Sequence, residues 1–205
     1  MSGHVVKNAG VVGWSAADSD EAALIERCLA GDEAACAELV AAHERMVFNL
    51  ALHLLGSREE ALDLPQDVFL RVFRTLPGFR GRSALRTWIY RIVVNQSRNR
   101  LRGWKRRFRG SQVSLDDHVE QHGDLVATRD APPDRLLARK EAAAHLSQAL
   151  DRLPFEQRTA VILREVEGLS YDEIAFSLGV VVGTVKSRLT RARQALRASL
   201  LGLQP

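Results

Sequence analysis

Residues 168–197 read GLSYDEIAFSLGVVVGTVKSRLTRARQALR, and this stretch decides the fold of the C-terminal part of the chain. Ser170 and Glu173 have the spacing of a capping box, which begins a short helix. Gly179 is the residue type that ends a helix in the left-handed conformation. A second helix is expected to begin near residues 182–184 and to continue to about residue 200. Two capped helices joined by a short turn predict a helix-turn-helix.

The second helix of this pair has two chemically different faces. At about 100° per residue, Val185, Leu189, Ala192 and Leu196 fall on one apolar stripe that must pack on the preceding helices. The opposite face is basic and carries hydroxyl groups, on Lys186, Ser187, Thr190, Arg191, Arg193, Gln194 and Arg197. Such groups suit base edges and phosphates, and Arg188, beside the stripe, suits the DNA backbone. The alternative is a solvated basic face, but its coincidence with a capped helix pair favours nucleic-acid binding.

The net charge of +4 is unevenly distributed along the sequence. Residues 97–109 contain seven basic side chains and residues 174–205 contain five, and neither block contains an acid. These two blocks carry +12, so the remainder of the chain carries −8. Trp104 and Phe108 lie within the first block, where aromatic rings can stack on unpaired bases while the cations neutralise phosphates. The distribution predicts a polyanion as partner.

Composition excludes several classes of protein. With 46% hydrophobic and 26% charged residues, the sequence is typical of a soluble globular protein. The most apolar stretch, Val47 to Leu55, is too short to span a bilayer, and the first thirteen residues lack the apolar core of a signal peptide. Two cysteines are too few for a disulfide framework. A cytoplasmic location without direct membrane insertion is therefore expected.

Helical periodicity dominates the rest of the chain and predicts an all-α fold with two small helical domains joined by an acidic flexible linker. Asp32, Ser57 and Ser83 are expected to cap helices, and Pro154 is expected at the first position of another. The linker is assigned where periodicity stops and six acids accumulate between Ser114 and Asp134, in a stretch that Pro132-Pro133 closes. The expected division is 1–19 tail, 20–109 first domain, 110–135 linker and 136–203 second domain ending in the helix-turn-helix.

The third expected helix combines an acidic face with an interior proline. Asp63, Gln66 and Asp67 share a face that suits a protein partner with a basic surface. The alternative is a helix N-terminus whose acids complement the macrodipole. Pro65 costs about 3 kcal/mol inside a helix or forces a kink, which would disturb this face. Leu62 is counted among the apolar positions expected to face the core.

Two other classes of function were compared with nucleic-acid binding. An enzyme would need a site that the sequence does not supply: Cys28 and Cys36 are read as small buried thiols, and the histidines form no metal-binding motif. Asp63 and Asp67 could share a metal, but no third carboxylate is placed to complete the site. We therefore expect no catalytic residue, metal, cofactor or small-molecule substrate. A helix-turn-helix regulator with an N-terminal sensing domain is the second alternative, although no strands for a receiver domain are evident.

Several motifs, in this order, resemble those of bacterial RNA polymerase sigma factors of the extracytoplasmic-function (ECF) group of the sigma-70 family. They are ALDLPQDVFLR at 61–71, FRGRS at 79–83, TWIYRIVVN at 87–95, GLSYDEIA at 168–175 and GTVKSR at 183–188. The resemblance covers roughly residues 20–108 and 136–200. Val181 departs from it, because a proline is common in the family before the last helix.

The resemblance implies a transcription initiation factor that binds core RNA polymerase and promoter DNA and is controlled by an anti-sigma factor. The core polymerase would be bound by Asp63, Gln66 and Asp67. The minus-ten element would be captured and melted by Phe79, Arg80, Gly81, Ser83, Asn95, Arg98 and Asn99. The minus-thirty-five element would be read by Thr184, Lys186, Ser187, Arg188, Thr190, Arg191 and Arg193. In the family the linker threads the RNA path of the polymerase, where its carboxylates would imitate a transcript.

Overall fold

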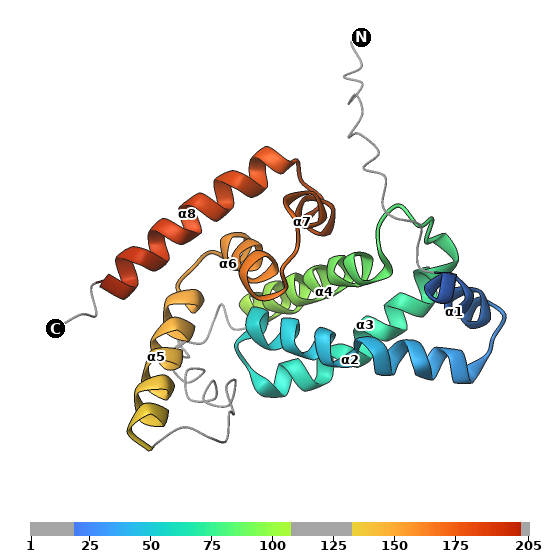
Figure 1. The fold of residues 1–205 in the computed structure, drawn as a ribbon, viewed down its shortest axis with the longest axis horizontal. Coiled ribbons are helices and arrows are strands. Elements are labelled where there is room, and N and C mark those ends of the chain that lie inside the picture. The colour runs from blue at the N-terminus through green and yellow to red at the C-terminus, as the bar shows by residue number, and fades with distance from the viewer. Residues whose placement is uncertain (1–18, 108–132, 202–205) are drawn as a thin grey trace, which may run out of the picture.

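The computed structural model describes residues 19–107 and 133–201, and all regular structure in these two ranges is helical (Figure 1). The first range contains α1 (Ser19–Leu29), α2 (Glu33–Leu55), α3 (Arg58–Thr75), the short 3-10 helix η1 (Leu76–Gly78) and α4 (Leu85–Arg107). The second contains α5 (Pro133–Asp151), α6 (Phe155–Val161), the π-helical turn η3 (Ile162–Val166), α7 (Tyr171–Leu178) and α8 (Val182–Leu201). The predicted all-α fold is confirmed.

The N-terminal helices pack around α2, which contacts α1, α3 and α4. Leu39, Leu50 and Leu54 of α2 are fully buried, and Leu64 of α3 joins them in the core. The side chain of Asp32 accepts a hydrogen bond from the Ala35 amide at 3.1 Å, as expected of an N-cap. Local caps and a buried apolar stripe therefore account for these helices together.

The C-terminal helices pack around α8, which contacts α5, α6 and α7. Ser170 and Glu173 form the reciprocal capping box at the start of α7. Gly179 ends α7 with φ of 65°, a left-handed conformation that any side chain would strain. Val185 and Leu189 of α8 are buried. The predicted helix-turn-helix pair, α7 and α8, thus has the expected caps and buried stripe.

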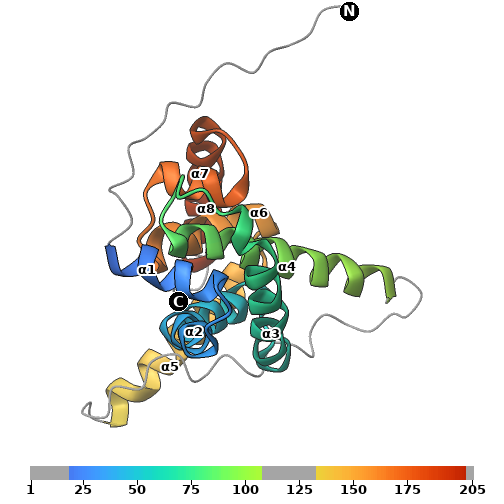
Figure 2. The same cartoon turned by 90° about the vertical axis from the view of Figure 1, so that its right-hand side faces the viewer.

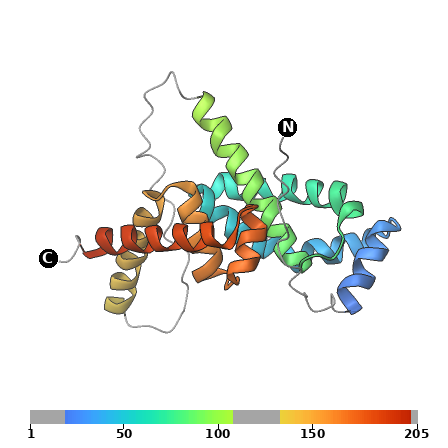
Figure 3. The ribbon, with the colours of Figure 1, turned by 90° about the horizontal axis from the view of Figure 1, so that it is seen from above.

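The two groups of helices touch each other along α4. Helix α7 packs on α4, and α6 contacts α2. The buried apolar side chains of both groups form one continuous cluster. Figure 2 and Figure 3 show the C-terminal part of α4 projecting beyond this contact, away from the other helices. The N-terminal part of α4 is consequently enclosed, and its basic C-terminal part is not.

The structure corrects two local predictions. Ser83 does not cap α4, because the amide of Leu85 donates instead to the Glu21 carboxylate of α1 at 3.4 Å. Pro154 is the N-cap of α6 rather than its first residue. Helix α3 contains Pro65 in its interior, as expected, and continues through it to Thr75.

Parts of the predicted domain division lie outside the described residues. Residues 1–18 of the expected tail lie outside the described residues, and its last residue, Ser19, begins α1. Residues 110–132 of the expected linker also fall there, and its last three residues belong to α5. The boundaries therefore remain predictions. None of the described helices is long and apolar enough to span a membrane.

The buried stripe of α8 yields a stability prediction. Leu189 is 1% exposed, so Leu189→Ala leaves a cavity and is expected to lower the free energy of unfolding by about 2–5 kcal/mol. Leu201 of the same helix is 54% exposed, so Leu201→Ala is the matched control and should cost less than about 0.5 kcal/mol. Urea unfolding followed by circular dichroism measures both. Equal effects of the two substitutions would contradict the packing of α8.

Candidate nucleic-acid interface

The outer face of α8 contains the residues predicted to read DNA. The exposed members of this set are Lys186, Thr190, Arg191 and Arg193. The half-buried members are Thr184, Ser187 and Arg188. The buried side chains of Val185 and Leu189 hold the opposite face against α6 and α7, which fixes the rotation of α8 about its axis. The basic surface is therefore built on a rigid element.

The hydroxyl groups of α8 already donate hydrogen bonds within the helix. Ser187 Oγ donates to the carbonyl of Thr184 at 2.9 Å, and Thr190 Oγ1 donates to the carbonyl of Lys186 at 3.0 Å. The hydroxyl oxygens keep their lone pairs. In this arrangement these two side chains can accept hydrogen bonds from the amino groups of bases.

The cations of α8 differ in whether an acid neutralises them. Arg193 pairs with Glu165 at 2.6 Å, and Arg188 pairs with Glu156 of α6 at 3.2 Å. Within the described part of the chain, Lys186 and Arg191 form no ion pair and both are exposed. Lys186 and Arg191 are thus the cations of the predicted set that can meet a phosphate or base without first leaving a carboxylate.

The loop between η1 and α4 brings some of its predicted residues to the surface. Phe79 packs against Trp88, with ring centroids 5.1 Å apart, and Arg80 is exposed. Gly81 has φ of 62°, and the space beside its α-carbon is open, so a backbone can approach it closely. Ser83 is only 3% exposed, and its Oγ has no partner among the described residues. The loop thus offers the partly buried Phe79 ring, an exposed cation and an accessible backbone, whereas Ser83 is buried.

The three predicted residues of α4 lie beyond this loop. Asn95 and Asn99 are exposed. Arg98 is half-buried: it donates to Asn95 at 3.5 Å and to the Glu156 carboxylate at 3.1 Å, and its guanidinium lies 5.5 Å from the centre of the Phe155 ring. Arg98 therefore contacts the C-terminal helices, which the sequence did not indicate.

The basic C-terminal end of α4 also faces the acidic helix α3. Arg100 pairs with Glu60 at 2.7 Å and with Asp67 at 2.9 Å. Arg102 and Arg106 are exposed. Trp104 is half-buried, and Phe108 and Arg109 lie outside the described residues. One cation of the basic block is thus bound to the predicted polymerase-binding face.

The predicted polymerase-binding face of α3 is exposed and partly apolar. Asp63, Gln66 and Asp67 all face solvent. Leu62 and Leu70 are 59% and 50% exposed, so the prediction that Leu62 faces the core is wrong. Leu62, Gln66 and Leu70 are four residues apart and share a helix face, a signal present in the sequence but assigned to the core.

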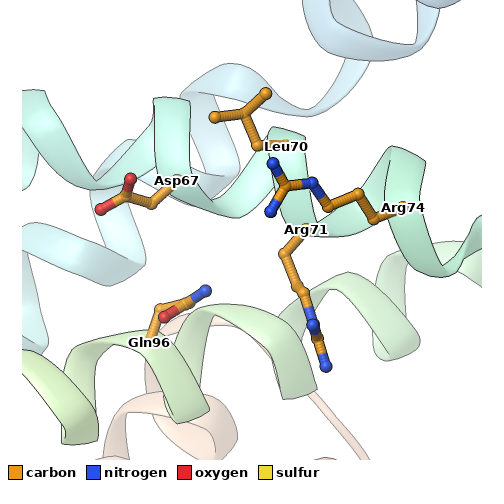
Figure 4. A pocket seen from close by; sticks show the side chains of 5 residues that line it. All are labelled: Asp67, Leu70, Arg71, Arg74 and Gln96. Carbon is orange, nitrogen blue, oxygen red and sulfur yellow. The ribbon is translucent and has the colours of Figure 1, made fainter.

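A shallow pocket of about 330 Å³ lies between α3 and α4 beside this face. Figure 4 shows its lining side chains, Asp67, Leu70, Arg71, Arg74 and Gln96. Two arginines, one carboxylate, one amide and one leucine give a mixed surface that suits the charged and apolar side chains of a protein partner. The motif at 61–71 contains Arg71, but sequence reasoning assigned no role to it or to Arg74.

The residues considered for enzymatic chemistry are placed differently. Burial raises the pKa of the Cys28 thiol to about 11, so it stays protonated and is a poor nucleophile near neutral pH. Asp67, considered for a metal, is paired with Arg100. Among the described residues, no group of three His, Cys, Asp or Glu side chains is arranged to hold a metal ion.

Comparisons with known proteins match both parts of the chain. Residues 39–108 match the family model of sigma-70 region 2, and residues 144–196 match that of sigma-70 region 4. The RNA polymerase sigma-H factor of Pseudomonas aeruginosa is 38% identical over 177 residues, covering 86% of this chain and 92% of the relative. The ECF RNA polymerase sigma-E factor of Escherichia coli K12 is 37% identical over 175 residues, covering 84% and 90%.

Solved structures share the fold. The sigma factor RpoE in complex with the anti-sigma factor NepR from Bartonella quintana has a TM-score of 0.65 at 24% identity, covering 82% of this chain and 97% of that one. CnrH in complex with the cytosolic domain of CnrY has a TM-score of 0.62 at 23% identity, covering 90% and 99%. From the relatives and the two matched regions, the chain belongs to the ECF group of the sigma-70 family, whose members are transcription initiation factors that direct bacterial RNA polymerase to promoters.

Proposed function

We propose that this chain binds core RNA polymerase through α3, captures the minus-ten element with the 79–83 loop and α4, and reads the minus-thirty-five element with α8. The observation that carries the proposal is the outer face of α8, which is basic, contains no acid and is held outward by a buried stripe. A helix of this kind fits the major groove, where side chains reach base edges. Lys186 and Arg191, which are exposed and unpaired among the described residues, are the first candidates.

The loop and α4 suit the capture of unpaired DNA. Melting exposes bases that can be flipped out and stacked on aromatic side chains. Phe79 and Trp88 provide rings beside the exposed Arg80, and Asn95 and Asn99 add hydrogen-bonding groups on the next helix. We expect this surface to bind the non-template strand of the minus-ten element. Ser83 would take part only after the loop has moved, because it is buried.

The face of α3 suits a helical protein partner. Its exposed leucines, Leu62 and Leu70, supply apolar area, and Asp63 and Asp67 supply negative charge at its rim. A partner helix with basic side chains complements both features. We assign this face to the core polymerase.

We infer that an anti-sigma factor controls the protein in the cell. The support comes from a structure of like fold that contains the sigma factor RpoE in complex with the anti-sigma factor NepR. In a second structure of like fold, CnrH is in complex with the cytosolic domain of CnrY. The chain acts on cytoplasmic polymerase in this proposal, and none of its described helices suits a membrane.

Substitutions on α8 test the reading of DNA. Lys186→Ala and Arg191→Ala are each expected to weaken binding of the polymerase complex to promoter DNA about tenfold, because each removes an exposed cation from the DNA-facing surface. Fluorescence anisotropy with labelled promoter DNA measures this effect. Affinity for core polymerase should stay unchanged.

The control for these variants is Arg152→Ala, which removes an exposed arginine directly after α5 instead of one on α8. It should leave promoter affinity unaltered. Loss of core association in the α8 variants would contradict the proposed division of labour. Binding of DNA by the pure protein, with no promoter-specific transcripts when core polymerase is added, would favour a helix-turn-helix regulator instead.

Substitutions on α3 test the binding of polymerase. Leu70→Ala and Asp63→Lys are each expected to weaken core binding about tenfold, since one removes apolar contact area and the other reverses a charge at the interface. Glu44→Lys, a charge reversal at an exposed site on α2, is the control. Surface plasmon resonance with immobilised core polymerase measures the affinities. Unchanged affinity for both α3 variants, with the fold intact by circular dichroism, would assign polymerase binding to another surface.

A further inference from the structure

Helix α1 carries an acid on the face that packs against the other helices. Cys28 of α1 is part of the buried core, and Leu24 and Ile25 pack against that core. Glu21 precedes Leu24 by three residues and Ile25 by four, so it lies on the same side of α1, one turn nearer the N-terminus. Glu21 is half-buried. A half-buried carboxylate needs a hydrogen-bond donor, because its desolvation is costly without one.

The donor is the start of α4. The backbone amide of Leu85, the first residue of α4, donates to Oε2 of Glu21 at 3.4 Å. Ala84 accepts the first hydrogen bond of this helix, from the amide of Trp88 at 3.1 Å, and is therefore its N-cap residue. The side chain of Ala84 has no atom that can accept from the first amides. Glu21, 64 residues earlier in the sequence, supplies the acceptor instead.

No second acceptor takes over this role within the described part of the chain. Ser83 is the local residue type that caps helices, but it is buried and its Oγ has no hydrogen-bond partner among the described residues. The first turn of α4 contains no acid of its own. The beginning of α4 is therefore defined by a residue of α1 and not by the residues beside it in the sequence.

Helix α1 also holds the other end of the 79–83 loop. It contacts η1, and Figure 1 shows α1 beside this turn. Leu76 of η1 is 2% exposed, and its carbonyl accepts a hydrogen bond from the amide of Phe79 at 2.9 Å. Both ends of the loop are thus tied to one helix, whereas residues 80–82 between them are exposed. Fixed ends reduce the number of conformations that the exposed part can adopt.

We propose that Glu21 is a positioning residue for the capture of the minus-ten element. By capping α4, it sets the conformation in which the 79–83 loop and the first turn of α4 meet the unpaired strand. The inference rests on the proposed function for the role of this loop. Glu21 acts through the Leu85 amide and not through DNA, because a carboxylate repels phosphates. Without the cap the first turn of α4 frays, and the affinity for the strand falls with the fraction of molecules in the competent conformation.

Glu21→Ala tests this role, and Glu26→Ala is its matched control. Glu26 is an exposed glutamate of the same helix. Both substitutions remove one negative charge, so both strengthen the non-specific attraction of DNA to a similar extent. A loss of affinity confined to Glu21→Ala is therefore opposite in sign to the effect of charge, and it reports the lost cap.

Fluorescence anisotropy measures the affinity of each complex with core polymerase for single-stranded DNA. The probe is the labelled single strand that the unsubstituted complex selects from a randomised pool. We expect Glu21→Ala to weaken its binding about fivefold. Glu21→Gln should weaken it less than about twofold, because an amide oxygen still accepts from Leu85. The affinity for the duplex selected in the same way, which α8 reads in the proposed function, should be equal in Glu21→Ala and Glu26→Ala.

Amide hydrogen exchange followed by mass spectrometry measures the cap without DNA. Exchange in the peptide that covers residues 79–88 should be faster in Glu21→Ala than in the unsubstituted protein, and unchanged in Glu26→Ala. Peptides from α2 and α8 should keep their protection, because the lost hydrogen bond is local.

The two measurements separate the possible outcomes. Unchanged strand affinity or unchanged exchange of residues 79–88 in Glu21→Ala would overturn the positioning role. Faster exchange of α2 together with the loop would reduce Glu21 to a general contribution to stability. An equal loss of affinity in Glu21→Gln and Glu21→Ala would assign the effect to charge and refute the capping hydrogen bond. Failure of the unsubstituted complex to select any single strand would instead contradict the proposed function, and hydrogen exchange would still test the cap.

Discussion

The double burial of α4 is the constraint on which the rest of the structure depends. This helix packs against α2 and α3 and also against α7. Ile89 and Val93 are fully buried, and so is Tyr90 on a different side of the helix. A helix that is buried on more than one side must find a partner for each. The partner of the second side comes from a segment about 80 residues later in the sequence, as the Tyr90–Glu167 contact shows.

Ion pairs between arginines and carboxylates of the same chain accompany this packing, and they involve both basic blocks of the sequence. The net charge of +4 is the sum of two basic blocks and an acidic remainder. Several arginines in both blocks form ion pairs with carboxylates of the same chain. Arg98 and Arg188 share Glu156, Arg193 has Glu165, and Arg100 spans two acids of α3. Ion pairs that are partly exposed contribute only about 0–1 kcal/mol each, so phosphates can replace the carboxylates at little cost. In the proposed function, DNA phosphates would therefore compete with these internal acids for the arginines.

Local signals in the sequence predicted local structure well. The caps at Asp32 and Ser170 and the left-handed stop at Gly179 were all predictable, because each depends on a few neighbouring residues. The Ser83 cap failed because Glu21, more than sixty residues earlier, provides the acceptor at the start of α4. The side chains that were predicted to bind DNA could be placed on helices, but their pairing with Glu156 and Glu165 depends on tertiary contacts. No periodicity in one segment indicates such contacts.

Helix α3 shows how an exposed apolar position can be mistaken for a core position. Periodicity identifies apolar positions, but it does not tell which neighbour covers them. Leu64 and Val68 are covered by this chain, whereas Leu62 and Leu70 are not. Pro65 does not break the helix, although it deprives the Ala61 carbonyl of its usual donor. Arg100 donates a hydrogen bond to the adjacent Glu60 carbonyl at 3.3 Å. This bond and the buried side chains of α3 stabilise the helical turn that precedes Pro65. The exposed leucines therefore remain on a continuous helix face, and burying them supplies the driving force for a partner that also meets the acids beside them.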